Sequence, residues 1–117
     1  MRHERSLLAK AYEAFNAGDP AALGATLHAD VQWPDSLEGG VLNGRAAVVD
    51  YFARQFDLMQ LDARQVTVRE EPPARIVLDI QYAVRSREGQ LWSDTRAVLA
   101  YDFADGLILR MTVLEGL

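Results

Sequence analysis

The sequence predicts an α+β fold in which helices cover one face of a curved, mainly antiparallel sheet. Two observations support this class. Up to Met59, apolar residues recur at the three- and four-residue spacing of amphipathic helices, and from Ala63 onward they alternate with polar residues, as in strands. The chain of 117 residues has room for one domain only, spanning residues 1–117.

The first two helices should form a tight hairpin. The first is expected from Ser6 to Ala17 and is ended by Gly18. Asp19 and Pro20 then suit an N-cap and a first helical residue, so a short second helix should run through Leu27. The buried face of the first helix carries Leu7, Leu8, Ala11, Tyr12 and Phe15.

The third helix follows a brief extended segment and a loop. Val31–Trp33 is strand-like and is ended by Pro34, and the segment from Ser36 to Gly44 contains adjacent glycines and an Asn-Gly pair, which mark a loop. Asn43 is expected to cap the helix. Its apolar stripe contains Val48, Tyr51, Phe52, Phe56 and Met59.

Four strands are expected in the second half, joined by short turns into an antiparallel meander. The turns are marked by Pro72-Pro73, Glu88-Gly89 and Asp105-Gly106. The strand-like runs are Ala63–Glu70, Arg75–Arg87, Gln90–Phe103 and Leu107–Glu115.

Composition excludes several classes of function. The net charge is −5 and the arginines are dispersed, which disfavours a nucleic-acid partner. No cysteine is present, so disulfides, thiolate metal sites and cysteine nucleophiles are excluded. His3 and His28 lack partners at ligand spacing, and no phosphate-binding glycine loop occurs, so we expect neither metal nor cofactor. Without a signal-peptide core or an apolar span, a cytoplasmic protein with no membrane partner is expected.

Four stretches of sequence resemble nuclear transport factor 2-like proteins of the SnoaL-like group. They are AYEAFNAGDP from Ala11, LHADVQW from Leu27, LNGRAAVVDYF from Leu42 and YDFADGLILR from Tyr101. The resemblance covers nearly the whole chain and implies a cone-shaped roll of three N-terminal helices wrapped by a strongly bent sheet. It also implies a homodimer formed through the outer sheet face. The superfamily includes ketosteroid isomerases, polyketide cyclases, dehydratases, epoxide hydrolases and non-catalytic binding proteins, so the fold alone does not define an activity.

Asp35 is the first candidate catalytic residue. The resemblance implies that it lies at the mouth of the cone, at the position where ketosteroid isomerases carry an aspartate base. A carboxylate beside Trp33 and near Tyr51 would be partly desolvated, which makes it a better base for a proton next to a carbonyl. The alternative is that Pro34-Asp35-Ser36 forms an ordinary solvated turn.

The hydrogen-bond donors of the ketosteroid isomerases are not reproduced. The matching positions carry Ala11 and Leu99, and Tyr12 is displaced by one residue, a rotation of about 100° on a helix. These substitutions leave two alternatives. One is an isomerase, cyclase or dehydratase acting on a small carbonyl compound, with Asp35 as base and Tyr12 or Tyr51 as donor. The other is a non-catalytic module for ligand binding or dimerisation.

A small hydrophobic ligand is the expected partner, and several side chains are candidates for lining its pocket. Glu115 shares the alternation of Met111 and Val113, a face that the resemblance directs into the cone, so it is a second candidate acid or base. The alternative for the aromatic residues and Met111 is ordinary core packing. The candidate pocket residues are Tyr12, Trp33, Tyr51, Tyr82, Trp92 and Met111.

Asp94 and Arg96 form a third constellation with Glu115. They alternate on one strand, and the resemblance to limonene epoxide hydrolase implies that such an Arg and Asp pair, with a second carboxylate, could activate water. The favoured interpretation is a cross-strand network with Asp79 and Gln81 on the outer face of the sheet, at a dimer interface.

Overall fold

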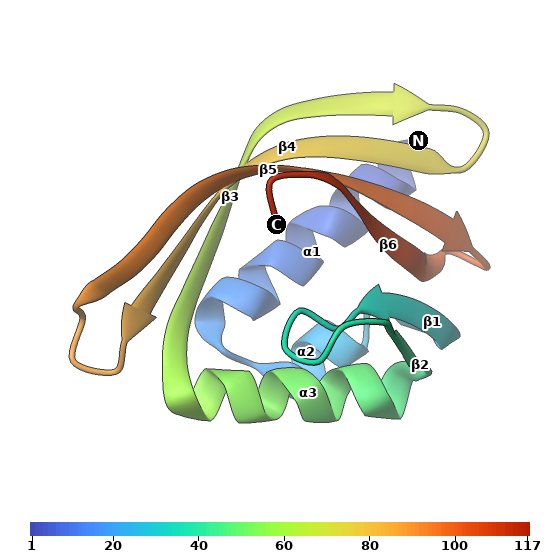
Figure 1. The fold of residues 1–117 in the computed structure, drawn as a ribbon. Helices are drawn as coiled ribbons and strands as arrows, with labels where there is room; N and C mark the ends of the chain where they lie inside the picture. The colour runs from blue at the N-terminus through green and yellow to red at the C-terminus, as the bar shows by residue number, and fades with distance from the viewer.

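Three helices and six strands form the fold in a computed structural model that describes all residues from Met1 to Leu117 (Figure 1). The helices are α1 (Arg2–Ala17), α2 (Pro20–Gly24) and α3 (Arg45–Leu58). The strands are β1 (Leu27–Pro34), β2 (Val41–Asn43), β3 (Met59–Glu71), β4 (Arg75–Ser86), β5 (Leu91–Ala104) and β6 (Leu107–Glu115). The predicted α+β class is therefore confirmed.

The six strands form one curved sheet in the order β2-β1-β6-β5-β4-β3. The expected meander of β3 to β6 is confirmed, and all pairs are antiparallel except β1 and β6, which run parallel. Two details differ from the prediction. Strands β1 and β2 join the sheet and make it mixed, and they separate α3 from the two helices that open the chain.

The predicted end of α1 and start of α2 are both present. Gly18 adopts a left-handed conformation with φ 67°, and its N–H donates to the carbonyl oxygens at the end of α1. The side chain of Asp19 accepts a hydrogen bond of 3.0 Å from the N–H of Ala22, and Pro20 is the first helical residue. The short α2 thus begins directly after α1 and folds back against it.

The predicted boundaries of all three helices differ from the structure. Helix α1 begins at Arg2 rather than Ser6, and α3 ends at Leu58, so that Met59 is the first residue of β3. Helix α2 ends at Gly24, and Leu27 is instead the first residue of β1, because Thr26 bonds through its hydroxyl and its N–H to the carbonyl of Leu23. Asn43 does not cap α3. It belongs to β2, and the N-cap is Gly44, whose φ of 94° is accessible at little cost only to glycine.

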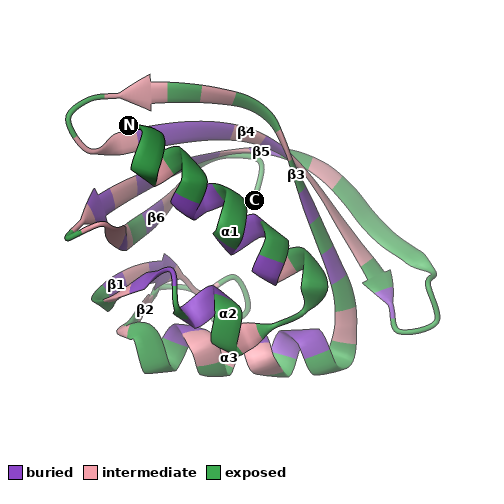
Figure 2. Cartoon of the chain, turned by 180° about the vertical axis from the view of Figure 1, so that it is seen from behind, coloured by how far each residue is buried: buried purple, intermediate pink, exposed green.

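The core lies between the helices and the concave face of the sheet. Figure 2 shows buried bands that alternate with exposed ones along α1 and α3, as expected for helices that bury one face. Leu8, Leu78 and Ile108, from one helix and two strands, have almost no exposed surface. No helix is long and apolar enough to span a membrane. The packing between the helices and the sheet leaves one apolar cavity unfilled.

Candidate functional site

An apolar cavity of about 80 Å³ lies between the helices and the concave face of the sheet. Every lining residue except Ser36 is hydrophobic, and no lining side chain carries a charge. Residues from all three helices and from five of the six strands contribute to it. The aromatic lining residues are Tyr12, Phe15, Trp33, Phe52, Tyr82 and Tyr101.

The aromatic rings contact one another around the cavity. Phe52 of α3 makes edge-to-face contacts with Trp33 and with Phe15, at centroid separations of 5.7 and 5.6 Å. Trp33 contacts Tyr101 in the same way at 6.0 Å, and Phe15 contacts Tyr82 at 6.0 Å. Since each ring is held by others from different elements, the wall is rigid on most sides.

Two tyrosine hydroxyls meet at one side of this apolar space. The hydroxyl oxygens of Tyr12, on α1, and Tyr101, on β5, lie 2.8 Å apart, and the two residues are only 9% and 3% exposed. Each phenol carries one O–H, and a single hydrogen bond between them uses only one of the two protons. The other O–H has no partner within the protein and is available to an acceptor in the cavity.

Both phenols are neutral, because burial disfavours the phenolate. Burial raises the pKa of Tyr12 well above its usual range, although its hydrogen bond with Tyr101 acts in the opposite direction. Burial likewise raises the pKa of Tyr101 far above 10.0, and the neighbouring Tyr12 adds to this effect. Burial, with a smaller contribution from Tyr51, raises the pKa of Tyr82 to about 12. The polar groups of the wall are therefore uncharged at neutral pH.

The structure places four of the six candidate pocket residues around the cavity. They are Tyr12, Trp33, Tyr82 and Met111. Tyr51 is outside the lining and packs edge-to-face on Phe52 at 5.1 Å. Trp92 is 57% exposed near the start of β5 and does not line the cavity.

The positions matched to isomerase donors do face the cavity. Ala11 and Leu99 both line it, so the apolar substitutions at these positions lie where a ligand would contact them. Sequence reasoning missed Tyr101 as the partner of Tyr12. It lies two residues after Leu99 on the same inward face of β5, so the alternation of Ala97, Leu99 and Tyr101 was the signal that could have identified it.

Asp35 lies in a turn at the edge of the cavity. Its Oδ1 atom accepts hydrogen bonds of 3.0 Å from the N–H groups of Leu37 and Glu38, which is the turn geometry given above as the alternative to catalysis. Asp35 does not line the cavity, but the next residue, Ser36, does. The Oδ2 atom of Asp35 makes no hydrogen bond within the protein.

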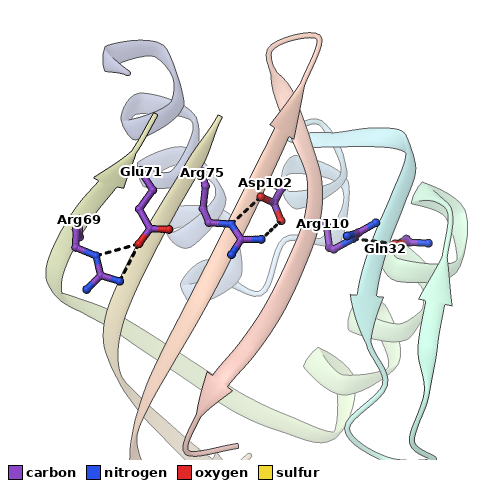
Figure 3. Close-up of polar contacts among 6 residues, drawn as sticks. All are labelled: Gln32, Arg69, Glu71, Arg75, Asp102 and Arg110. Atoms are coloured by element: carbon purple, nitrogen blue, oxygen red, sulfur yellow. Dashed lines mark hydrogen bonds and ion pairs between the residues drawn. The ribbon is translucent and has the colours of Figure 1, made fainter. Parts of the chain in front are cut away.

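Asp94 and Arg96 lie on the outer face of the sheet and form the predicted cross-strand network. Arg96 makes a bidentate ion pair with Asp79, with bonds of 3.2 and 2.7 Å, and Gln81 donates to Asp94. Neither residue lines the cavity, so the epoxide hydrolase-like arrangement with Glu115 was wrong. Further pairs continue across the same face, which is turned away from the helices (Figure 3). They join Arg69 to Glu71, Arg75 to Asp102 and Arg110 to Gln32.

A β-bulge changes the facing expected for Glu115. Leu99 pairs with Val113 but the preceding Val98 pairs with Glu115, so Leu114 is an extra residue in β6. Directly paired residues share a face, which moves Glu115 to the outer side with Val98 and away from Val113. Glu115 is exposed and does not line the cavity. The expectation that it points into the cone with Met111 was therefore wrong.

The helices wrapped in a bent sheet, with an apolar cavity at their contact, define a nuclear transport factor 2-like fold. The family model of the SnoaL-like domain matches residues 8–111. The chain thus belongs to the SnoaL-like family, as its sequence predicted. No curated protein matches it in sequence.

Solved structures from several bacteria share the fold. A candidate polyketide cyclase from Xanthomonas campestris pv. campestris is 25% identical, with a TM-score of 0.83 over 96% of this chain and 89% of that one. A Mycobacterium tuberculosis protein in complex with estradiol-17β-hemisuccinate is 19% identical, with a TM-score of 0.82 over 93% and 89%. The Δ5-3-ketosteroid isomerase of a Mycobacterium species is 15% identical, with a TM-score of 0.82 over 94% and 90%. The two mycobacterial comparisons establish the shared fold alone.

Proposed function

We propose that the protein binds a small, uncharged, hydrophobic molecule that carries one hydrogen-bond acceptor, such as a ketone. The observation that carries this proposal is the buried pair of Tyr12 and Tyr101, which leaves one O–H unused in an otherwise apolar cavity. An apolar enclosure with a few well-placed polar groups is the usual form of a small-molecule site. The apolar body of the ligand would contact the aromatic wall, and its acceptor would bond the free hydroxyl.

The cavity wall contains no charged side chain, and this determines which class of ligand is favoured. A carboxylate or ammonium group in this cavity would lose its hydration without gaining an opposite charge. A carbonyl or ether oxygen would lose less hydration free energy on entering the cavity, because the free tyrosine O–H replaces its hydrogen bond to water. Neutral acceptors are therefore favoured over ionised ligands.

Binding is measured through Trp33, which lines the cavity and is one of only two tryptophans. Replacing the exposed Trp92 by Phe leaves Trp33 as the only tryptophan reporter. In this background, cyclohexanone should bind about tenfold more tightly than cyclohexane, since only the ketone accepts a hydrogen bond. Tyr101→Phe or Tyr12→Phe should reduce this preference, whereas Tyr51→Phe, outside the lining, should preserve it. Equal affinity for the two compounds, or an unchanged preference in both tyrosine variants, would contradict the proposal.

Proton transfer by Asp35 is the second candidate function. It is supported by the place of Asp35 beside Ser36, at the edge of the cavity, and by its Oδ2 atom, which has no partner within the protein. In this mechanism the carboxylate removes a proton next to the ligand carbonyl while the free tyrosine O–H stabilises the developing enolate. Deuterium exchange at the α-carbons of cyclohexanone measures this step. Asp35→Asn should abolish the protein-dependent exchange while ketone affinity persists, and exchange at the unaltered rate would exclude the role.

A further inference from the structure

The cavity is small for the ligands that its chemistry favours. Its volume of about 80 Å³ is roughly half that of an engineered apolar cavity of about 150 Å³ that binds benzene. Known small-molecule pockets usually measure about 300–1,000 Å³. A ligand with even one ring would therefore need part of the wall to move.

Most of the wall is not free to move. The aromatic side chains pack on one another, and nearly all the aliphatic lining residues are buried in the core. Only Ser36 and Leu117 are exposed among the lining residues. Ser36 is small and follows Asp35, whose hydrogen bonds hold that turn. Leu117 is large and apolar, and it is 57% exposed although it lines the cavity.

Leu117 reaches the cavity through a sharp turn after β6. Gly116 has a φ of 95°, and a Cβ atom there would overlap the carbonyl oxygen of Arg96 and lie 2.9 Å from the Cα of Ala97. Glycine is thus needed both for the conformation and for the close approach to β5. Figure 1 shows the chain turning back beneath the sheet at this point. Gly116 and Leu117 lie beyond the last residue of β6, so the strand ladder does not hold them.

We infer that Leu117 caps the mouth of the cavity and determines the size of the ligand that enters. With Leu117 in place, the site admits only small molecules. A larger ligand has to displace Leu117, and this costs less than displacing a buried lining residue, because a side chain that is more than half exposed loses fewer contacts on leaving. Displacement of Leu117 opens the cavity at a side where its lining is exposed and not closed by core packing. The inference deepens the proposed binding function, because it names the residue that sets the ligand class by size.

The capping role is tested without any ligand by acrylamide quenching of Trp33 fluorescence. In the Trp92→Phe background, Leu117→Ala should raise the quenching constant about threefold, because the quencher gains access through the mouth. Leu117→Phe should leave it unchanged or lower it. The matched control is Leu114→Ala, which removes a similarly exposed leucine of β6 that does not line the cavity. Equal effects of Leu117→Ala and Leu114→Ala would overturn the inference.

Ligand selectivity tests the size-determining role separately. Leu117→Ala should improve the affinity for 4-ethylcyclohexanone relative to cyclohexanone about tenfold, as expected when a few methyl-sized groups are removed from an apolar wall. A changed quenching constant with an unchanged affinity ratio would refute the size-determining role. If the quenching constant changes but neither ketone binds to any variant, the capping role is supported and the proposed function fails.

Discussion

The Tyr12–Tyr101 pair permits a quantitative prediction about stability. Tyr12→Phe or Tyr101→Phe alone leaves the other buried hydroxyl without its partner, which should lower the free energy of unfolding by about 1–3 kcal/mol. The double replacement removes both hydroxyls and keeps both rings, so no polar group is stranded. It should cost less than the sum of the two single replacements, with a coupling energy of at least about 1 kcal/mol.

Urea unfolding, followed by circular dichroism, measures this cycle. For a protein of this size, where unfolding free energy falls by about 1–3 kcal/mol per molar urea, a loss of about 2 kcal/mol moves the midpoint by about 1 M. Tyr51→Phe serves as the control, because its hydroxyl makes no hydrogen bond with another side chain. If the two single effects simply add, the hydroxyls are not coupled and the site described above is wrong.

Three further predictions concern other parts of the fold. Asn16→Ala should destabilise the protein by about 1–3 kcal/mol in urea unfolding, because the side-chain amide of Asn16 bonds both the N–H and the carbonyl of Ala63 on the free edge of β3. Asn43→Ala is the control and should change the stability little, because the side chain of Asn43 makes only two hydrogen bonds, each 3.4 Å long. Because burial raises the pKa of Tyr82 to about 12, its neutral form stabilises the fold fully below pH 10, and this contribution is lost as the pH rises toward about 12. Tyrosinate absorbance at 295 nm should therefore increase together with unfolding. Full tyrosinate absorbance with native circular dichroism would refute this. A homodimer through the outer sheet face, which stays a prediction, should dissociate in Arg96→Glu, because Arg96 lies on that face, and sedimentation showing a monomer for the unaltered protein would exclude it.

The spacing of apolar residues was sufficient to predict the helices and strands, but not all the residues at which they begin and end. The change from helical to alternating spacing near Met59 located the helices and the meander, because burial on one face is a local property of the sequence. The end of α2 and the cap of α3 were missed because they depend on tertiary contacts. Thr26 ends α2 by bonding back to Leu23, and the pairing of Asn43 with β1 takes it out of the helix.

The site was partly predictable for the same reason. Alternation correctly directed Tyr82 and Met111 inward, and helical spacing did so for Tyr12. Alternation failed at Glu115, because the bulge at Leu114 reverses the facing of the residues beyond it and leaves no clear mark in the sequence. The hydrogen bond between Tyr12 and Tyr101 joins residues 89 positions apart, so no local pattern could reveal it.

A crystal structure of the protein soaked with cyclohexanone tests the central claim most directly. We expect the ring against the aromatic wall, and the carbonyl oxygen within about 3.2 Å of the hydroxyl of Tyr12 or Tyr101. A ketone bound with its oxygen turned away from both hydroxyls, or a cavity that stays empty while the ketone binds on the outer face, would contradict the account.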